Sequence, residues 1–73
     1  MNERDYWVVL EKGPTSWGAY VPDLPGCVAV ADTREEAEEL IREAIEFHIE
    51  GLHRHGLSAP VPASEVSRVR VAA

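Results

Sequence analysis

Three short apolar runs and one long apolar stripe divide the chain into its predicted elements. Runs rich in β-branched and aromatic residues predict strands at 5–11, 17–21 and 27–31, separated by turn-forming residues. Because the connections are short, we expect the three strands to form an antiparallel meander. Pro22 and Pro25 fix two φ angles in the second connection, so this loop should be stiff.

At Thr33 the pattern changes to helical periodicity. Thr33 and Glu36 have the spacing of a capping box, in which the threonine hydroxyl accepts a hydrogen bond from the glutamate amide. Apolar residues then recur at alternating steps of three and four, which predicts an amphipathic helix over 34–55 that ends at Gly56. The stripe comprises Ala37, Leu40, Ile41, Ala44, Ile45, His48, Ile49 and Leu52. The opposite side is acidic and should be solvated, with i,i+4 ion pairs from Glu38 to Arg42 and from Glu50 to Arg54.

The last segment alternates polar and apolar residues again. This pattern predicts a fourth strand over 67–71, with Val69 and Val71 pointing inward. The helix would return the chain so that this strand lies parallel beside the first, reached by a right-handed crossover. We therefore expect an α+β fold of order β-β-β-α-β, with one helix on one face of the sheet. It would be a single domain spanning 1–73, with a flexible N-terminus over 1–4.

Both faces of the first strand are apolar. The period of two places Trp7 and Val9 on one face and Tyr6, Val8 and Leu10 on the other. One helix covers only one face, so the face carrying Trp7 needs another cover, and aromatic residues are enriched in interfaces. We expect Trp7, Val9 and Trp17 to contact a partner or a second copy. The alternative is that the ends of the chain cover this face.

Composition narrows the function classes. The 73 residues include 13 acidic and 7 basic side chains, a net charge of −6, which disfavours nucleic acid and suits a basic protein partner. One cysteine cannot form an internal disulfide, and no secretion signal or membrane-spanning run is present, so we expect a cytoplasmic protein. A core of this size supplies only about 3 to 5 kcal/mol, which favours a homo-oligomer, either a dimer or a tetramer.

No group of residues predicts catalysis. His48 belongs to the apolar stripe, whereas His53 and His55 lie elsewhere on the helix, so a shared metal ion is not expected. His48 is instead expected to be a part-buried packing or interface residue. Cys27 follows Gly26 at the start of an apolar run without a neighbouring base, as a packed thiol would. We expect no enzymatic activity, no cofactor and no metal site.

A set of short motifs resembles a known family. The segment Val21-Pro22-Asp23-Leu24-Pro25-Gly26-Cys27, followed by Ala31-Asp32-Thr33 and Glu35-Glu36-Ala37, resembles the HicB-like antitoxin family, and the resemblance spans residues 5 to 62. It implies a truncated ribonuclease H-like sheet. It also implies a partner, a small basic HicA-type toxin that cleaves messenger RNA and whose active surface the antitoxin covers.

Two features depart from the family pattern. Ala31 stands where the family usually has glycine, and the sequence stops at Ala73, before the DNA-binding domain that longer members carry. Direct DNA binding is therefore not expected. Within the shared motif, Asp23 and Leu24 should hold a turn, and both are candidate contacts with a partner or a second copy. The alternative for Leu24 is a core residue.

Three functions remain to be compared. The leading hypothesis is a non-catalytic antitoxin that binds and inhibits a HicA-type toxin. The alternative is an orphan homo-oligomeric interaction domain of the same fold with no toxin partner. The third is a metal-dependent nuclease, which would need converging acids, whereas the strands carry only Asp5 and Glu11 at their ends.

Overall fold

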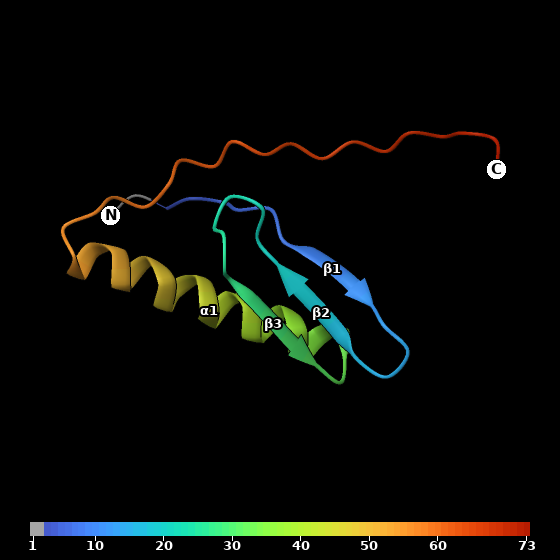
Figure 1. The fold of residues 1–73 in the computed structure, drawn as a ribbon, viewed down its shortest axis with the longest axis horizontal. Helices are drawn as coiled ribbons and strands as arrows, with labels where there is room; N and C mark the ends of the chain where they lie inside the picture. The colour runs from blue at the N-terminus through green and yellow to red at the C-terminus, as the bar shows by residue number, and fades with distance from the viewer. Residues whose placement is uncertain (1–2) are drawn as a thin grey trace.

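The chain forms a three-stranded sheet followed by one helix. A computed structural model describes residues 3–73, in which β1 (Val9–Lys12), β2 (Trp17–Tyr20) and β3 (Val28–Ala31) precede α1 (Arg34–Arg54). The strands pair antiparallel in the order β1-β2-β3, and α1 packs against one face of the sheet (Figure 1). The predicted α+β class and the β-β-β-α order are confirmed.

The elements are shorter than the sequence predicts. Each strand has four residues, so 5–8, 21 and 27 lie outside the strands, and α1 ends one residue before the predicted 55. Residues 1 and 2 of the predicted flexible N-terminus lie outside the described residues. Arg4, in the same predicted segment, is held by hydrogen bonds to the carbonyls of Ala59 and Pro60.

The prediction of a fourth strand over 67–71 is wrong. Residues 57–73, here called the tail, contain no strand and run extended alongside the sheet and past its end (Figure 1). Val69 and Val71, predicted to point inward, are 78% and 73% exposed. Alternation of polar and apolar residues predicts which side chains share a face of a strand. A strand also needs a neighbouring strand to pair with, and the tail has none within the described chain. A ribonuclease H-like sheet would need this fourth strand, so the likeness to ribonuclease H stays a prediction.

The loop between β2 and β3 consists of two consecutive turns. The amide of Leu24 donates to the carbonyl of Val21 at 3.1 Å, and the amide of Cys27 donates to the carbonyl of Leu24 at 3.1 Å. Gly26 has a φ of 85°, so Pro25 and Gly26 have the residue types and the positive φ of a type II turn. The predicted turn is confirmed, and it places the Leu24 side chain in the core with 0% exposure.

The core is small and lies between the sheet and the start of α1. Its buried members come from β2, the following loop and the helix: Ala19, Val21, Leu24, Cys27, Ala37 and Ile41. Burial raises the pKa of the Cys27 thiol, consistent with the expected packing role. Tyr6, Val8 and Leu10 pack against this cluster as the period of two predicts.

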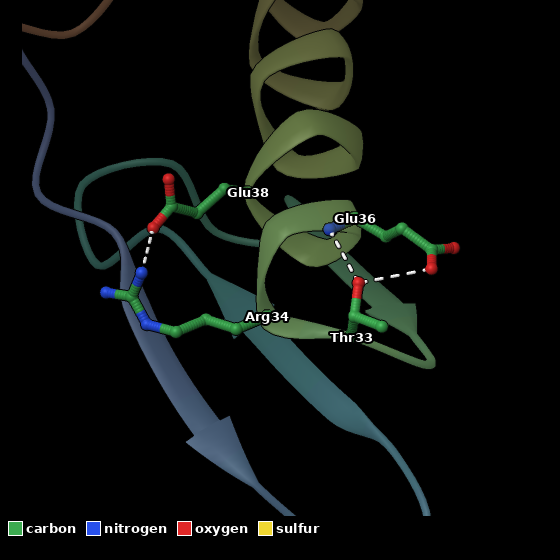
Figure 2. Close-up of polar contacts among 4 residues, drawn as sticks. All are labelled: Thr33, Arg34, Glu36 and Glu38. Carbon is green, nitrogen blue, oxygen red and sulfur yellow. Dashed lines mark hydrogen bonds and ion pairs between the residues drawn. The ribbon is translucent and has the colours of Figure 1, made fainter.

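The two ends of α1 are fixed by local hydrogen bonds. At the start, the hydroxyl of Thr33 accepts from the amide of Glu36 at 3.1 Å and donates to the Glu36 carboxylate (Figure 2). At the other end, Gly56 has a φ of 72°, and the amide of Leu57 donates to the carbonyl of Leu52 at 2.8 Å, as in a Schellman motif. Both predicted caps are confirmed.

Candidate partner-binding surfaces

The face of the sheet opposite α1 is apolar and uncovered within the described chain. The strand register aligns Val9, Tyr20 and Val28 across the three strands, with Val30 further along β3. Tyr20, Val28 and Val30 are 41%, 64% and 68% exposed, and Trp7, which precedes β1, is 52% exposed. We call these five residues the open face. Contiguous exposed apolar residues of this kind mark interaction sites.

The two tryptophans lie on different sides of the sheet. Trp7 belongs to the open face, whereas Trp17 pairs with Ala31 in the register and packs against the core on the side of α1. Trp17 was predicted to share a surface with Trp7 because the period of two was applied only to the first strand. Counting the same period through β2 and β3 places Tyr20, Val28 and Val30 on the face of Trp7, and these three residues were not predicted as contacts.

The outer side of α1 carries a continuous row of carboxylates. Glu36, Glu39, Glu43, Glu46 and Glu50 follow one another at steps of three and four, so they form one stripe, and all five are exposed. We call this row the acidic stripe. Like charges at these spacings destabilise a helix by a few tenths of a kcal/mol per pair. The stripe therefore lowers the stability of α1 and creates a surface that attracts cations.

Few cations neutralise this side of the helix. Arg34 pairs with Glu38 rather than Glu38 with Arg42, so the first predicted ion pair is wrong in its partner (Figure 2). The second predicted pair, between Glu50 and Arg54, is present at 2.5 Å. This ion pair neutralises only Glu50, the last residue of the acidic stripe.

Asp23 binds the tail. Its carboxylate accepts hydrogen bonds from the hydroxyl of Ser64 at 2.8 Å and from the amides of Ser64 and Ala63 at 3.2 Å. The Ser64 hydroxyl and amide stabilise the charged carboxylate and lower the pKa of Asp23 below its ordinary value of 3.8. Asp23 thus connects two segments that lie 41 residues apart.

A second set of contacts holds the start of the tail. The hydroxyl of Tyr6 donates to the carbonyl of Pro60 at 2.6 Å, and Arg4 donates to the carbonyl of Ala59 at 2.5 Å. We call these contacts, together with the Asp23 bonds, the tail clasp. The sequence contained no local signal for them, because each partner lies at least 40 residues away.

His48 does not join a cluster of ionisable groups. It is half-buried and lines a shallow hollow of about 290 Å³ with Phe47, Leu52 and His55. His55 is occupied locally, because its Nδ1 lies 2.8 Å from the carbonyl oxygen of Gly51. Among residues 3–73, no three histidine, cysteine, aspartate or glutamate side chains are grouped as metal ligands would be.

Comparison with known proteins assigns the family. The sequence profile described as the HicB-like antitoxin of bacterial toxin-antitoxin systems matches residues 6–72. The chain belongs to the HicB-like antitoxin family. The predicted resemblance is confirmed, and its match covers the sheet, the helix and nearly all of the tail.

The chain is also similar to several individual proteins. A UPF0150 protein of Synechocystis is 41% identical over 85% of this chain and 77% of its own length. A UPF0150 protein of Thermoplasma acidophilum is 38% identical over 75% of the chain and 81% of its own length. A 14.9 kDa protein of Haemophilus phage HP1 is 45% identical over 64% of the chain, which spans 35% of that protein. No solved structure matches the chain.

Membership in a toxin-antitoxin family implies a toxin as partner. The chain offers three surfaces for protein contacts, namely the open face, the acidic stripe and the extended tail. No helix within residues 3–73 has the length and apolar character needed to cross a membrane.

Proposed function

We propose that this HicB-like protein is a non-catalytic cytoplasmic antitoxin that neutralises a small basic HicA-type ribonuclease by direct binding. The observation that supports the proposal is the acidic stripe on a chain of this family. All five residues are exposed, so their carboxylates are accessible without unfolding any element. A basic toxin surface would meet an array of negative charge there and would be withheld from RNA.

The stripe suits this role better than a structural one. Its carboxylates make only one ion pair within the described chain, at Glu50, and they repel one another along the helix. Complementary charge across an interface raises the association rate and selects the partner. A cationic partner would therefore relieve the repulsion that the free protein carries.

The test is inhibition of RNA cleavage by the HicA-type toxin encoded beside the gene. We expect the wild-type chain in excess to abolish cleavage. The double variant Glu39→Lys/Glu43→Lys should bind the toxin at least about tenfold more weakly, because it reverses the charge at the centre of the stripe. Undiminished cleavage with excess wild-type protein would remove the inhibitory role.

A matched control separates the stripe from total charge. Glu3→Lys/Glu65→Lys changes the net charge by the same amount at two exposed positions outside α1. This variant should inhibit nearly as well as the wild type. An equal loss in both double variants would assign the effect to net charge and would contradict a binding role for the stripe.

The open face favours a second candidate, an orphan homo-oligomeric interaction domain. Its exposed residues Trp7, Tyr20, Val28 and Val30 are suited to contact another protein and need no toxin. Light-scattering mass with and without the toxin distinguishes the two candidates. A mixed complex supports the antitoxin, whereas an oligomer indifferent to the toxin supports the orphan domain.

A further inference from the structure

A second apolar patch lies on the second half of α1. Both buried residues of the helix, Ala37 and Ile41, belong to its first half, and the second half extends past the sheet (Figure 1). On this half the side chain of Phe47 is 75% exposed. It borders the hollow of about 290 Å³ whose other lining residues are His48, Gly51, Leu52, His55 and Leu57. An exposed aromatic ring and an open, mainly apolar hollow therefore lie next to each other on one helix.

Gly51 leaves open space at this hollow. A Cβ atom built on Gly51 would meet no atom within 4 Å, and its φ is not positive. Glycine weakens the interior of a helix, because it loses more backbone freedom on folding than any other residue. The packing of the described chain gives no reason for a glycine at 51, whereas the close approach of another molecule does.

Phe47 and Gly51 belong to a narrow apolar stripe. Leu40, Ala44, Phe47 and Gly51 follow one another at steps of four, three and four, which is the spacing at which one helix packs along a second. We call these four residues the helix seam. Because the second half of α1 extends past the sheet, the seam is open to a helix outside the described chain.

The helix seam is complementary to itself. In an antiparallel pair of helices, residues at equal distances on opposite sides of the two-fold axis lie level with one another. An axis level with Ile49 sets Phe47 of each copy against Gly51 of the other, since both residues lie two positions from Ile49. The exposed ring of one copy then enters the hollow of the other, and the symmetry makes this contact twice.

The charged residues that flank this contact have opposite signs. Glu43 precedes Phe47 by four residues, Arg54 follows Gly51 by three, and both are exposed. The antiparallel arrangement places Glu43 of each copy near Arg54 of the other, whereas a parallel two-fold pair would place like charges together. The order of charge, ring and hollow along the helix therefore fits a second copy of the same chain.

We propose that two copies of the chain associate through antiparallel α1 helices, with Phe47 of each copy in the hollow beside Gly51 of the other. The helices lie side by side over 44–54, which is about three turns. The two sheets lie toward opposite ends of the pair, because each sheet covers only the first half of its helix (Figure 1). The contact uses neither the toxin nor the open face, so its test is independent of the antitoxin proposal.

Sedimentation velocity over a concentration series tests the association. A contact of this size is that of a weak dimer, so the mass of the wild type should rise from 8.1 kDa to twice that value as its concentration approaches about 1 mM. Phe47→Ala should raise the dissociation constant of the dimer at least about tenfold. Because the ring is exposed, the variant should keep its fold, and circular dichroism checks this.

A truncation on the open face provides the control. Val30→Ala shortens a side chain that is 68% exposed, and it should leave the dissociation constant unchanged. A wild type that stays monomeric would overturn the proposal, and loss of toxin binding by Phe47→Ala in that case would assign the hollow to the toxin. A dimer that Phe47→Ala leaves intact, or that Val30→Ala weakens equally, would overturn it as well.

Gly51→Gln separates association from folding. Glutamine is a better helix former than glycine, and the single chain has room for its side chain, so the melting temperature of dilute protein should rise. The same side chain occupies the hollow, so the dissociation constant should rise at least about tenfold. A dimer as tight as that of the wild type would contradict the proposal. A fall in the melting temperature would make glycine a requirement of the single chain and would contradict it too.

Exchange of the flanking charges tests the direction of the helices. Glu43→Arg and Arg54→Glu each place like charges together and should weaken the dimer. Within one chain the two positions are eleven residues apart, about 16 Å along the helix axis, so they cannot contact each other. The double variant Glu43→Arg/Arg54→Glu restores opposite charges between the copies and should recover most of the affinity. A double variant that dimerises no better than the single ones would exclude the antiparallel pair.

Discussion

Asp23 and Leu24 are adjacent in the chain and have separate tasks. The two turns direct Leu24 into the core and leave Asp23 at the surface, where it binds the backbone and hydroxyl of the tail. The sequence predicted the turn from Pro22 and Pro25, because proline acts on the local backbone. It left the role of Leu24 open between core and partner contact, and the structure places Leu24 in the core. The partner of Asp23 could not be predicted, since no local pattern specifies a residue 41 positions away.

The first prediction concerns the titration of Asp23. Its folded pKa is below 3.8, so the clasp contributes its full stabilisation above pH 3.8 and loses it as the pH falls through the folded pKa. The chemical shifts of the Ala63 and Ser64 amides, followed by NMR during acidification, should report this change. Asp23→Asn should remove the transition and bring both amides toward random-coil shifts already at neutral pH.

A matched substitution separates the titration of Asp23 from other effects of acid on the protein. Asp32→Asn alters an exposed aspartate outside the clasp, and it should leave the transition at Ala63 and Ser64 in place. A midpoint at or above 3.8 in the wild type would contradict the role assigned to Asp23.

At the scale of elements, the helix was more predictable than the strands. The capping pattern and the three-four periodicity of α1 are local, so both of its ends were anticipated to within one residue. A strand depends on its neighbours, and the three strands came out shorter than their apolar runs. The same limitation explains the wrong fourth strand, whose alternation was real although no strand within the described chain pairs with it.

The second prediction concerns the start of α1. Thr33→Ala removes the hydroxyl that accepts from the Glu36 amide, and this should lower the free energy of unfolding by about 1 kcal/mol. In a domain of this size the melting temperature should fall by roughly 4 to 8 °C. Circular dichroism during heating and urea titration measures both quantities at one fixed protein concentration.

The corresponding change at another exposed threonine provides the comparison. Thr15→Ala lies in the turn between β1 and β2, and its effect should stay within about 0.5 kcal/mol. Equal losses from the two substitutions would mean that the cap has no particular importance for this helix.

At the scale of the whole molecule, charge and apolar surface are separated in space. The acidic stripe occupies the outer side of α1, the open face occupies the opposite side of the sheet, and the tail projects from one end (Figure 1). Composition predicted an acidic protein, and the period of two along the first strand predicted an apolar face that the helix does not cover. Neither signal could predict the contacts that hold the tail, because these contacts span most of the chain.

The third prediction concerns the ionic strength dependence of toxin binding. If the stripe guides a basic partner, the association rate constant should fall about tenfold when salt rises from about 0.01 M to about 0.15 M. The dissociation rate should change much less. Stopped-flow mixing with the toxin measures both rates, and Glu39→Gln/Glu43→Gln should flatten the salt dependence. A rate that is constant across this range would place the contact elsewhere.

The tail clasp also has a consequence for the order of folding. The hairpin of β1 and β2, the turns after β2 and the helix caps all close over a few residues, whereas the clasp joins positions separated by 40 to 56 residues. Contacts of high sequence separation form late, because the entropy of closing the intervening chain opposes them. The clasp is therefore the last step of folding within one chain, and the first to open when the protein begins to unfold.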